Sequence, residues 1–205
     1  MNLKKIDEQL AQGLENVGIN TANVLQSDMF SALKSGTNYV IEAPKDSGKT
    51  TLMVMHIIQR LKKQVGENPR ALIIVPNRSD VDYLGELFST IGAYNNLRVF
   101  KVYDHGDIDY DKNLISLGID VLIGTPNKLN LMFGSAGFNG NTLQIISFFN
   151  ANELITSRYE TILHRLCDSI LKAQRVIWCE KISEKIENLA LRVMEEPIFY
   201  EYEEE

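Results

Sequence analysis

The triplet with the clearest chemical potential is Gly48-Lys49-Thr50, which follows a short apolar run and precedes a helical pattern. In a strand–loop–helix context, backbone amides and the helix N-terminus cradle phosphates, the lysine reaches the β- and γ-phosphates, and the threonine hydroxyl ligates Mg²⁺. We therefore predict a phosphate loop in which Thr50 holds Mg²⁺ only when a nucleotide is bound. The predicted nucleotide-binding residues of this loop are Pro44, Lys45, Asp46, Ser47, Gly48, Lys49, Thr50 and Thr51.

Asp46 counts against tight binding by this loop. Its carboxylate repels an anionic ligand, and its side chain restricts φ where glycine would be free. Lys45, the preceding residue, offsets part of the charge. The sequence leaves two interpretations open: the loop binds ATP or ADP with Mg²⁺, or it is kept only as a structural turn.

The elements that would position the loop alternate along the chain. Seven short runs rich in Val, Ile and aromatic residues predict strands buried on both faces, with helical patterns between them. The predicted strands cover residues 39–43, 71–75, 97–102, 121–123, 144–149, 176–179 and 198–200. This alternation predicts a single α/β domain over residues 1–205, with a mainly parallel central sheet of about seven strands.

The helical patterns carry apolar residues three or four positions apart, as expected for helices that cover a sheet. The apolar positions are Leu52, Met55, Ile58 and Leu61 in one helix, Val81, Leu84, Leu87 and Phe88 in another, and Ile182, Ile186, Leu189, Ala190 and Val193 in a third. Two further helices are predicted within residues 1–35, the second starting near Thr21.

Composition favours a globular protein of a reducing compartment. The 205 residues are 44% hydrophobic and 23% charged and include two cysteines, Cys167 and Cys179. No signal peptide is recognisable, and no apolar run approaches the roughly 18 residues of a membrane span, so we expect a cytoplasmic protein without a membrane partner. The net charge of −6 disfavours a broad nucleic-acid surface. Residues 201–205 are interpreted as a solvated acidic tail.

Motif spacing over nearly the whole chain resembles the N-terminal RecA-like domain of DEAD-box RNA helicases. Gln26 lies 23 residues before Lys49, where that family has the glutamine that contacts the adenine edge. The resemblance implies a three-layer RecA-like P-loop NTPase fold and adds Gln26 to the nucleotide-binding residues, within a helical N-terminal part of residues 1–35. No aromatic residue among residues 1–25 supplies the family's supporting ring. The alternative is an ordinary surface glutamine on a helix.

Two other segments resemble motifs that contact the RNA backbone, so the resemblance implies RNA as a weakly bound partner. The predicted nucleic-acid-binding residues are Pro76, Asn77 and Arg78 in one segment and Thr125, Pro126, Asn127 and Lys128 in the other. Lys128 keeps the family's positive charge but lacks the bidentate fork of arginine. The second segment has an equally strong alternative, in which Thr125 caps a helix and Pro126 occupies its first turn.

The family's acidic hydrolysis motif falls on Phe149-Asn150-Ala151-Asn152 in this chain. The first acid of that motif normally holds Mg²⁺ and the second positions the attacking water, and neither a phenyl ring nor an amide can replace them. Glu153 could compensate only if the strand end shifted by one residue. The family's Ser-Ala-Thr motif falls on Cys179-Glu180-Lys181, which lacks both hydroxyls. We therefore predict no catalytic residue; the altered positions are Phe149, Asn150, Asn152, Cys179 and Lys181.

The remaining nucleophiles and potential metal ligands favour structural roles. Cys179 ends an apolar strand without an evident His–acid pair, which is typical of a buried structural cysteine. His56, His105 and His164 do not have metal-ligand spacing, so we predict no zinc site.

Three hypotheses for function follow. The leading one is a helicase-like pseudoenzyme that binds nucleotide weakly at most, does not hydrolyse it, and acts on RNA or through a protein partner. The second is an interaction scaffold that binds no nucleotide. The third is an ATP-dependent RNA helicase subunit that needs a partner, because we expect no second RecA-like domain within 205 residues.

Overall fold

One parallel sheet organises the protein, in a computed structural model that describes residues 3–156 and 158–203. Its seven strands run in the order β3-β4-β2-β5-β6-β1-β7, and every neighbouring pair is parallel. The strands are β1 (Tyr39–Glu42), β2 (Ala71–Ile74), β3 (Val99–Val102), β4 (Val121–Gly124), β5 (Ile145–Phe148), β6 (Gln174–Cys179) and β7 (Ile198–Glu201). The predicted α/β class and the seven predicted strands are confirmed.

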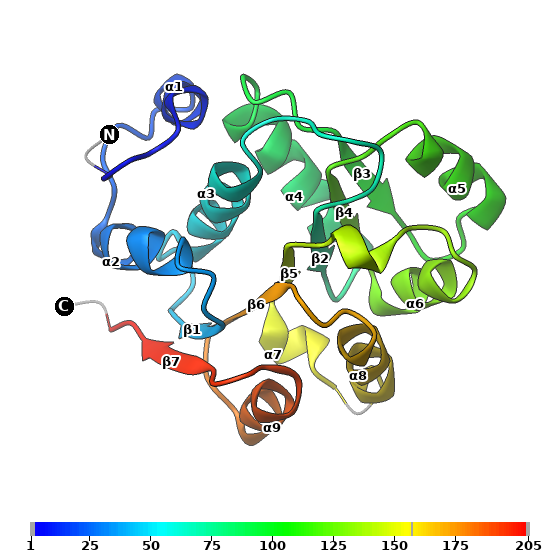
Figure 1. Ribbon diagram of the computed structural model, residues 1–205. Helices are drawn as coiled ribbons and strands as arrows, with labels where there is room; N and C mark the ends of the chain where they lie inside the picture. Colours follow the sequence, from blue (N-terminus) through cyan, green and yellow to red (C-terminus); the bar gives the residue numbers. More distant parts are fainter. Residues whose placement is uncertain (1–2, 157, 204–205) are drawn as a thin grey trace.

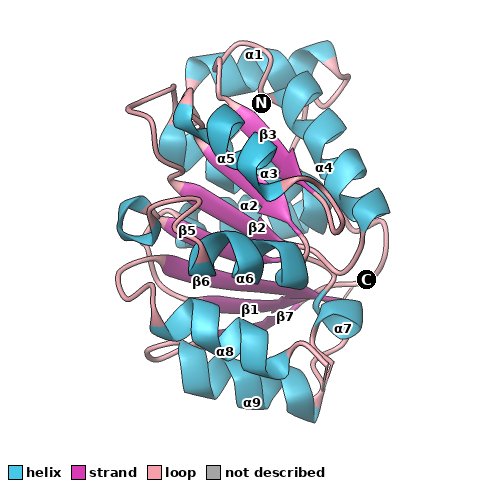
Figure 2. Ribbon diagram, turned by 90° about the vertical axis from the view of Figure 1, so that its right-hand side faces the viewer, coloured by secondary structure: helices cyan, strands magenta, loops and turns pink. Residues whose placement is uncertain are grey.

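Helices cover both faces of the sheet and complete three layers (Figure 1). The helices are α1 (Glu8–Asn16), α2 (Val24–Leu33), α3 (Lys49–Leu61), α4 (Arg78–Ile91), α5 (Ile108–Ser116), α6 (Pro126–Gly134), α7 (Ala151–Leu154), α8 (Glu160–Asp168) and α9 (Glu184–Val193), and a short 3₁₀ helix η1 spans Gly140–Thr142. Helices α1 to α4 cover one face, and α5 to α9 cover the other, where α6 lies in front of the strands in Figure 2 and α8 and α9 lie below it.

The strands divide the apolar core into two clusters because successive side chains point to opposite faces. Along β1, Ile41 packs in the cluster beneath α1 to α4, whereas Val40 packs in the cluster beneath α5 to α9. The side chains of β2, β4, β5 and β6 are buried along their whole length. The predicted burial on both faces is therefore correct for these four strands.

Three details differ from the sequence predictions. The edge strands are less buried than predicted: Ile198 and Phe199 of β7 are exposed, and most of β3 is half-buried, because each edge strand has a neighbour on one side only. Helix α2 begins at Val24 rather than near Thr21, because Asn23 caps it. Ile182 precedes α9, whose first turn is capped by Ser183.

Because all strands are parallel, their carboxyl ends lie at the same end of the sheet, and the predicted motifs that follow these strands lie there together. The phosphate loop follows β1, the segment 76–78 follows β2, the segment 125–128 follows β4, the segment 149–152 follows β5 and Lys181 follows β6. Within the described residues, no helix combines the length and apolar character needed to cross a bilayer.

Candidate nucleotide-binding site

The phosphate loop connects β1 to α3 with two residues at positive φ. Gly48 precedes the first turn of α3 at a φ of 84°, and Asp46 has a φ of 60°. A Cβ on Gly48 would come within 2.8 Å of both the Asn23 Nδ2 and the Gln26 Nε2 atoms and would displace these side chains, and the positive φ itself favours glycine. Asp46 occupies a left-handed conformation that aspartate adopts less readily than glycine.

The ammonium group of Lys49 is turned back onto its own loop. Its Nζ atom donates hydrogen bonds of 2.7 Å to the Ala43 carbonyl oxygen and 3.0 Å to the Pro44 carbonyl oxygen. The residue is buried, and burial lowers the pKa of its amine, partly opposed by the negative charge of Glu180. The group expected to meet the β- and γ-phosphates is thus satisfied by backbone oxygens in this conformation.

Helix α2 braces the loop through its N-terminal capping residues. The Asn23 side chain accepts from the Gln26 amide at 2.9 Å and donates to the Ser47 carbonyl oxygen at 2.7 Å. Gln26 accepts from the Asn23 amide at 3.2 Å and lies 3.4 Å from the Gly48 carbonyl oxygen through Nε2. With 5% of its surface exposed, Gln26 is not the ordinary surface glutamine of the alternative interpretation. Its contact with an adenine edge stays a prediction.

A cavity of about 350 Å³ opens beside the loop. Its lining residues are Lys45, Asp46, Gly48, Lys49, Thr50, Thr51, Asp80, Tyr83, Phe149, Asn150 and Glu180. Of the predicted nucleotide-binding residues, the structure brings six to this wall; Pro44, Ser47 and Gln26 lie outside the lining set. Ser47 is buried, and among residues 3–156 and 158–203 no group hydrogen-bonds its hydroxyl. The Ser47 hydroxyl in the loop, together with Lys49 and Thr50, forms a set of donors that fits a phosphate ligand.

Asp80 and Tyr83 belong to this cavity, although the sequence interpretation did not include them. Both lie on α4, whose N-terminus is fixed by the Asn77 side chain accepting from the Asp80 amide at 3.0 Å. Burial raises the pKa of the Asp80 carboxyl, and the charge of Glu153 raises it further, whereas the neighbouring Asn150 amide acts in the opposite direction. The sequence did hold one indication of this role for Asp80: it is an acid in the first turn of the helix that follows β2.

Segment 149–152, which the sequence resemblance predicts to fall on the family's acidic motif, is held by backbone hydrogen bonds and burial. The Phe149 amide donates to the Ile74 carbonyl oxygen at 2.9 Å, its ring is largely buried, and Asn150 adopts a left-handed φ of 53°. Glu153 is exposed on α7, so the strand end has not shifted in the way a compensating Glu153 would require.

Asn152 joins this segment to the one that follows β6. Its side chain accepts from the Glu180 amide at 2.8 Å and from the Lys181 amide at 3.3 Å, and it donates to the Lys181 carbonyl oxygen at 2.6 Å. The Lys181 ammonium forms an ion pair of 2.8 Å with Glu42 at the end of β1. The ends of β5, β6 and β1 are therefore cross-linked through Asn152, Lys181 and Glu42.

The two cysteines are buried. Burial raises the pKa of the Cys179 thiol to about 12 and that of Cys167 to about 11, so neither thiol ionises near neutral pH. Both groups are therefore poor nucleophiles. In the described part of the chain, no cluster of three or more His, Cys, Asp or Glu side chains could hold a metal ion. A cation in the cavity would need ligands from a nucleotide as well as from Thr50.

Only part of the predicted RNA surface is exposed. The Arg78 guanidinium lies 4.6 Å from the centre of the Tyr103 ring and 3.8 Å from Asp82, and its side chain is mostly exposed. Pro76 and Asn77 are half-buried beside it. This arginine can meet a phosphate without losing a strong internal ion pair.

The second predicted RNA segment is directed inwards. Thr125 occupies the N-cap position of α6 and Pro126 opens that helix, as the alternative predicted, but the Thr125 hydroxyl donates to Asp104 at 2.8 Å and makes no capping hydrogen bond. The Lys128 ammonium lies 2.6 Å from an Asp111 carboxylate oxygen and donates to the Gly106 carbonyl oxygen at 2.7 Å. Lys128 is 3% exposed, and its charge is neutralised by Asp111 inside the protein, so a phosphate contact by this lysine requires the side chain to turn outward and stays a prediction.

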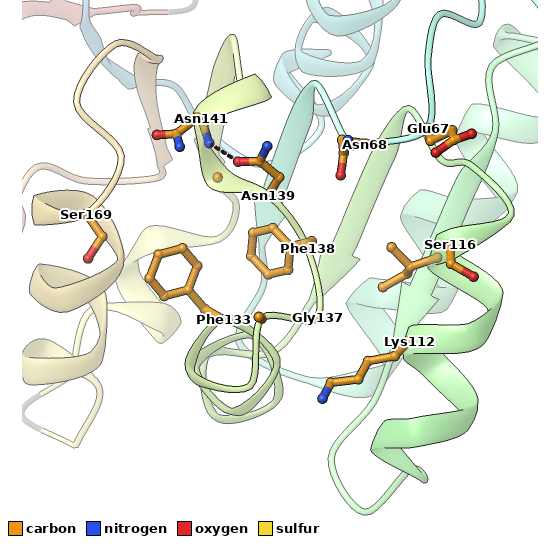
Figure 3. A pocket seen from close by; sticks show the side chains of 13 residues that line it. Glu67, Asn68, Lys112, Ser116, Phe133, Gly137, Phe138, Asn139, Asn141 and Ser169 are labelled. Carbon is orange, nitrogen blue, oxygen red and sulfur yellow. Dashed lines mark hydrogen bonds between the residues drawn. The ribbon is translucent and has the colours of Figure 1, made fainter.

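A second, larger cavity of about 640 Å³ lies where segments 62–70 and 135–144 lead into β2 and β5, at the amino ends of the strands and opposite the phosphate loop (Figure 3). The Phe133 and Phe138 rings, 5.7 Å apart, lie at its centre, with Asn139 beside Phe138, Lys112 on one side and Ser169 on the other. None of the predicted site residues lines it.

A three-layer parallel α/β fold with a phosphate loop between β1 and α3 defines a RecA-like P-loop domain. Comparison with known families narrows this class: the DEAD/DEAH box helicase family matches residues 23–189. The chain therefore belongs to the DEAD/DEAH box helicase family, in agreement with the sequence resemblance.

Known relatives cover most of this chain. It is 20% identical to the eukaryotic initiation factor 4A of Caenorhabditis elegans, over 95% of this chain and 48% of the relative. It is 25% identical to the DEAD-box ATP-dependent RNA helicase 7 of Oryza sativa, over 93% of this chain and 29% of the relative. It is 31% identical to the ATP-dependent RNA helicase RhlB of Xanthomonas oryzae, over 58% of this chain and 22% of the relative. The chain thus spans about half of these relatives or less.

Proposed function

We propose that this chain acts as a single RecA-like domain of pseudoenzyme type, which binds ATP or ADP with Mg²⁺ weakly and does not hydrolyse it. Its role would be RNA binding or RNA-related regulation in the cytoplasm, with an exposed surface around Arg78 meeting the RNA backbone. The named activities of the relatives, which are ATP-dependent RNA helicases, favour RNA as the partner. The two buried, unpaired cysteines are in keeping with a reducing compartment.

The observation that carries this proposal is that Phe149 and Asn150, which the sequence resemblance aligns with the acidic motif, line the same cavity as Lys49 and Thr50. Phosphoryl transfer in this class depends on positioning and on electrostatic stabilisation of the transferred group. A phenyl ring provides neither metal ligation nor a proton acceptor. The retained lysine and threonine support binding of the phosphates without turnover.

Calorimetric titration with ATP and with ADP, in the presence and absence of Mg²⁺, tests the binding half of the proposal. We expect weak binding that is lost in Lys49→Ala; an unchanged affinity in that variant would remove the site assignment. A phosphate-release assay with RNA tests the other half. Release above the Lys49→Ala background would show hydrolysis and revive the hypothesis of an active subunit.

A second candidate function is an interaction scaffold that binds no nucleotide. It is favoured by the carbonyl-bound Lys49 and by the left-handed Asp46, which together leave the loop closed on itself. The absence of heat with nucleotide at millimolar concentration, together with recovery of a protein partner and not RNA in a pull-down, would support this alternative over the first.

A further inference from the structure

The charges around the phosphate-loop cavity are poorly suited to a free nucleotide. Three acids line the cavity, Asp46, Asp80 and Glu180, against two lysines, Lys45 and Lys49. A polyphosphate adds several negative charges to this set, and like charges within a few ångströms repel each other strongly. Binding at this site therefore requires a counter-charge in addition to the two lysines.

Asp80 differs from the other two acids in its surroundings. Asp46 and Glu180 are exposed and can be hydrated, whereas Asp80 is half-buried. The Asn150 side chain is the neighbour that favours the charged form of Asp80, and within the ranges 3–156 and 158–203 no hydrogen bond of regular geometry reaches its buried Oδ2 atom. A half-buried carboxylate with so few donors is costly, and a cation is one group that can satisfy it.

We propose that Asp80 provides the carboxylate that faces the divalent cation of a bound metal–nucleotide complex, directly or through a water molecule, in place of the acid that is absent at Phe149. This inference rests on the proposed nucleotide binding. Mg²⁺ is commonly bound by one or two carboxylates together with phosphate oxygens and waters, so one protein acid is sufficient. Asp80 and Thr50 line the same cavity, and α4 fixes Asp80 through the Asn77 cap.

The other nearby acid does not fit this role. Glu153 is on the exposed surface of α7 and is absent from the cavity wall. Its charge does act on Asp80, because it raises the pKa of that carboxyl. A divalent cation beside Asp80 would relieve the same repulsion.

The test compares ATP affinity with excess Mg²⁺ and with EDTA in the wild-type protein, in Asp80→Asn and in Glu86→Gln. Glu86 is an exposed acid of the same helix, outside the nucleotide cavity, and serves as the matched control. We expect Mg²⁺ to strengthen binding at least about tenfold in the wild type and in Glu86→Gln, since one charge interaction of this kind corresponds to a kilocalorie or more. In Asp80→Asn the gain should fall below about threefold, while metal-free ATP binds more tightly because one repelling charge is gone.

The outcomes separate this inference from the function on which it rests. An equal Mg²⁺ gain in wild type and Asp80→Asn would overturn the role of Asp80 while leaving nucleotide binding intact. No binding of ATP to the wild type under either condition would overturn the proposed nucleotide binding and this inference with it. Thermal melting of each variant identifies any loss caused by misfolding.

Electron paramagnetic resonance of Mn²⁺ provides a second measurement that does not depend on the heat of nucleotide binding. With ATP present, the wild-type protein should remove free Mn²⁺ from solution beyond the amount that ATP binds alone. Asp80→Asn should remove no more than ATP alone. Equal retention by the two proteins would contradict the proposal.

Discussion

The Nζ atom of Lys49 lies 2.7 Å from the carbonyl oxygen of Ala43, which is the first residue after β1. A second bond to the Pro44 carbonyl oxygen completes this closure. A nucleotide must break both bonds before its phosphates can meet the ammonium, and each bond to a charged donor contributes on the order of 1.5–3 kcal/mol. This competition within the loop gives a physical reason for the weak affinity that we propose.

Replacing Asp46 should strengthen nucleotide binding. Asp46→Gly removes a negative charge from the cavity and relieves a left-handed conformation that disfavours residues other than glycine. We expect the affinity for Mg²⁺–ATP to rise about tenfold, measured by calorimetry. Asp46→Asn removes only the charge, because asparagine tolerates this conformation, and so separates the two effects. Equal or weaker binding in both variants would contradict this account of the loop.

Placing an acid at Asn152, where the sequence resemblance predicts the last acid of the family's motif, should destabilise the protein. Asn152→Asp loses the donor to the Lys181 carbonyl oxygen and places a carboxylate against that oxygen. We expect the free energy of unfolding to fall by about 1 kcal/mol in urea denaturation, with no gain in phosphate release. Glu153→Gln, at the next and exposed position, is the control and should unfold like the wild type. A more stable Asn152→Asp would refute the cross-linking role.

Alanine substitutions of the two basic residues predicted to contact RNA should have different effects, one on RNA binding and the other on stability. Arg78→Ala should weaken RNA binding several-fold and leave stability nearly unchanged, because the side chain is exposed. Lys128→Ala should cost about 3 kcal/mol of unfolding free energy, since it leaves Asp111 without its buried partner. Filter binding at fixed salt and urea denaturation measure the two effects. Weaker RNA binding by a correctly folded Lys128→Ala would show that this lysine turns outward.

Stability should decrease in mild acid because of His56. Burial lowers the pKa of this imidazole in α3 to about 4, below the unfolded value of about 6.5. The unfolded chain therefore takes up a proton more readily, so the contribution is complete above about pH 6.5 and is lost as pH falls towards about 4. We expect a loss of about 2 kcal/mol between about pH 7 and about pH 5, reduced in His56→Gln. His105→Gln, an exposed control, should keep the full loss.

The fold was predictable from the sequence because most of its strands are short, continuous apolar runs. Central strands of a parallel sheet are buried on both faces, so β2, β4 and β6 appear as short apolar runs between helices. Edge exposure was missed because the order of strands in the sheet does not follow their order in the chain. No local property of β7 indicates that β1 alone is its neighbour.

The site was predictable only where the motif is local. Gly48, Lys49 and Thr50 are consecutive, whereas Asp80 reaches the same cavity through the packing of α4. The inward direction of Lys128 depends on Asp111, which is on another helix. Positive charge in a sequence is not positive charge at a surface, because a partner distant along the chain can neutralise it.

The position of β1 in the sheet has a consequence for the time at which the phosphate loop forms. Tyr39 in β1 pairs with Val176 in β6 and with Ile198 in β7, strands that a ribosome makes long after the loop itself. Pairing between such distant segments is slow, and exposed strand edges invite association with other chains. The loop's supporting strand therefore has no native neighbour until β6, which begins at Gln174, has been synthesised, and β1 stays an open strand edge for most of synthesis.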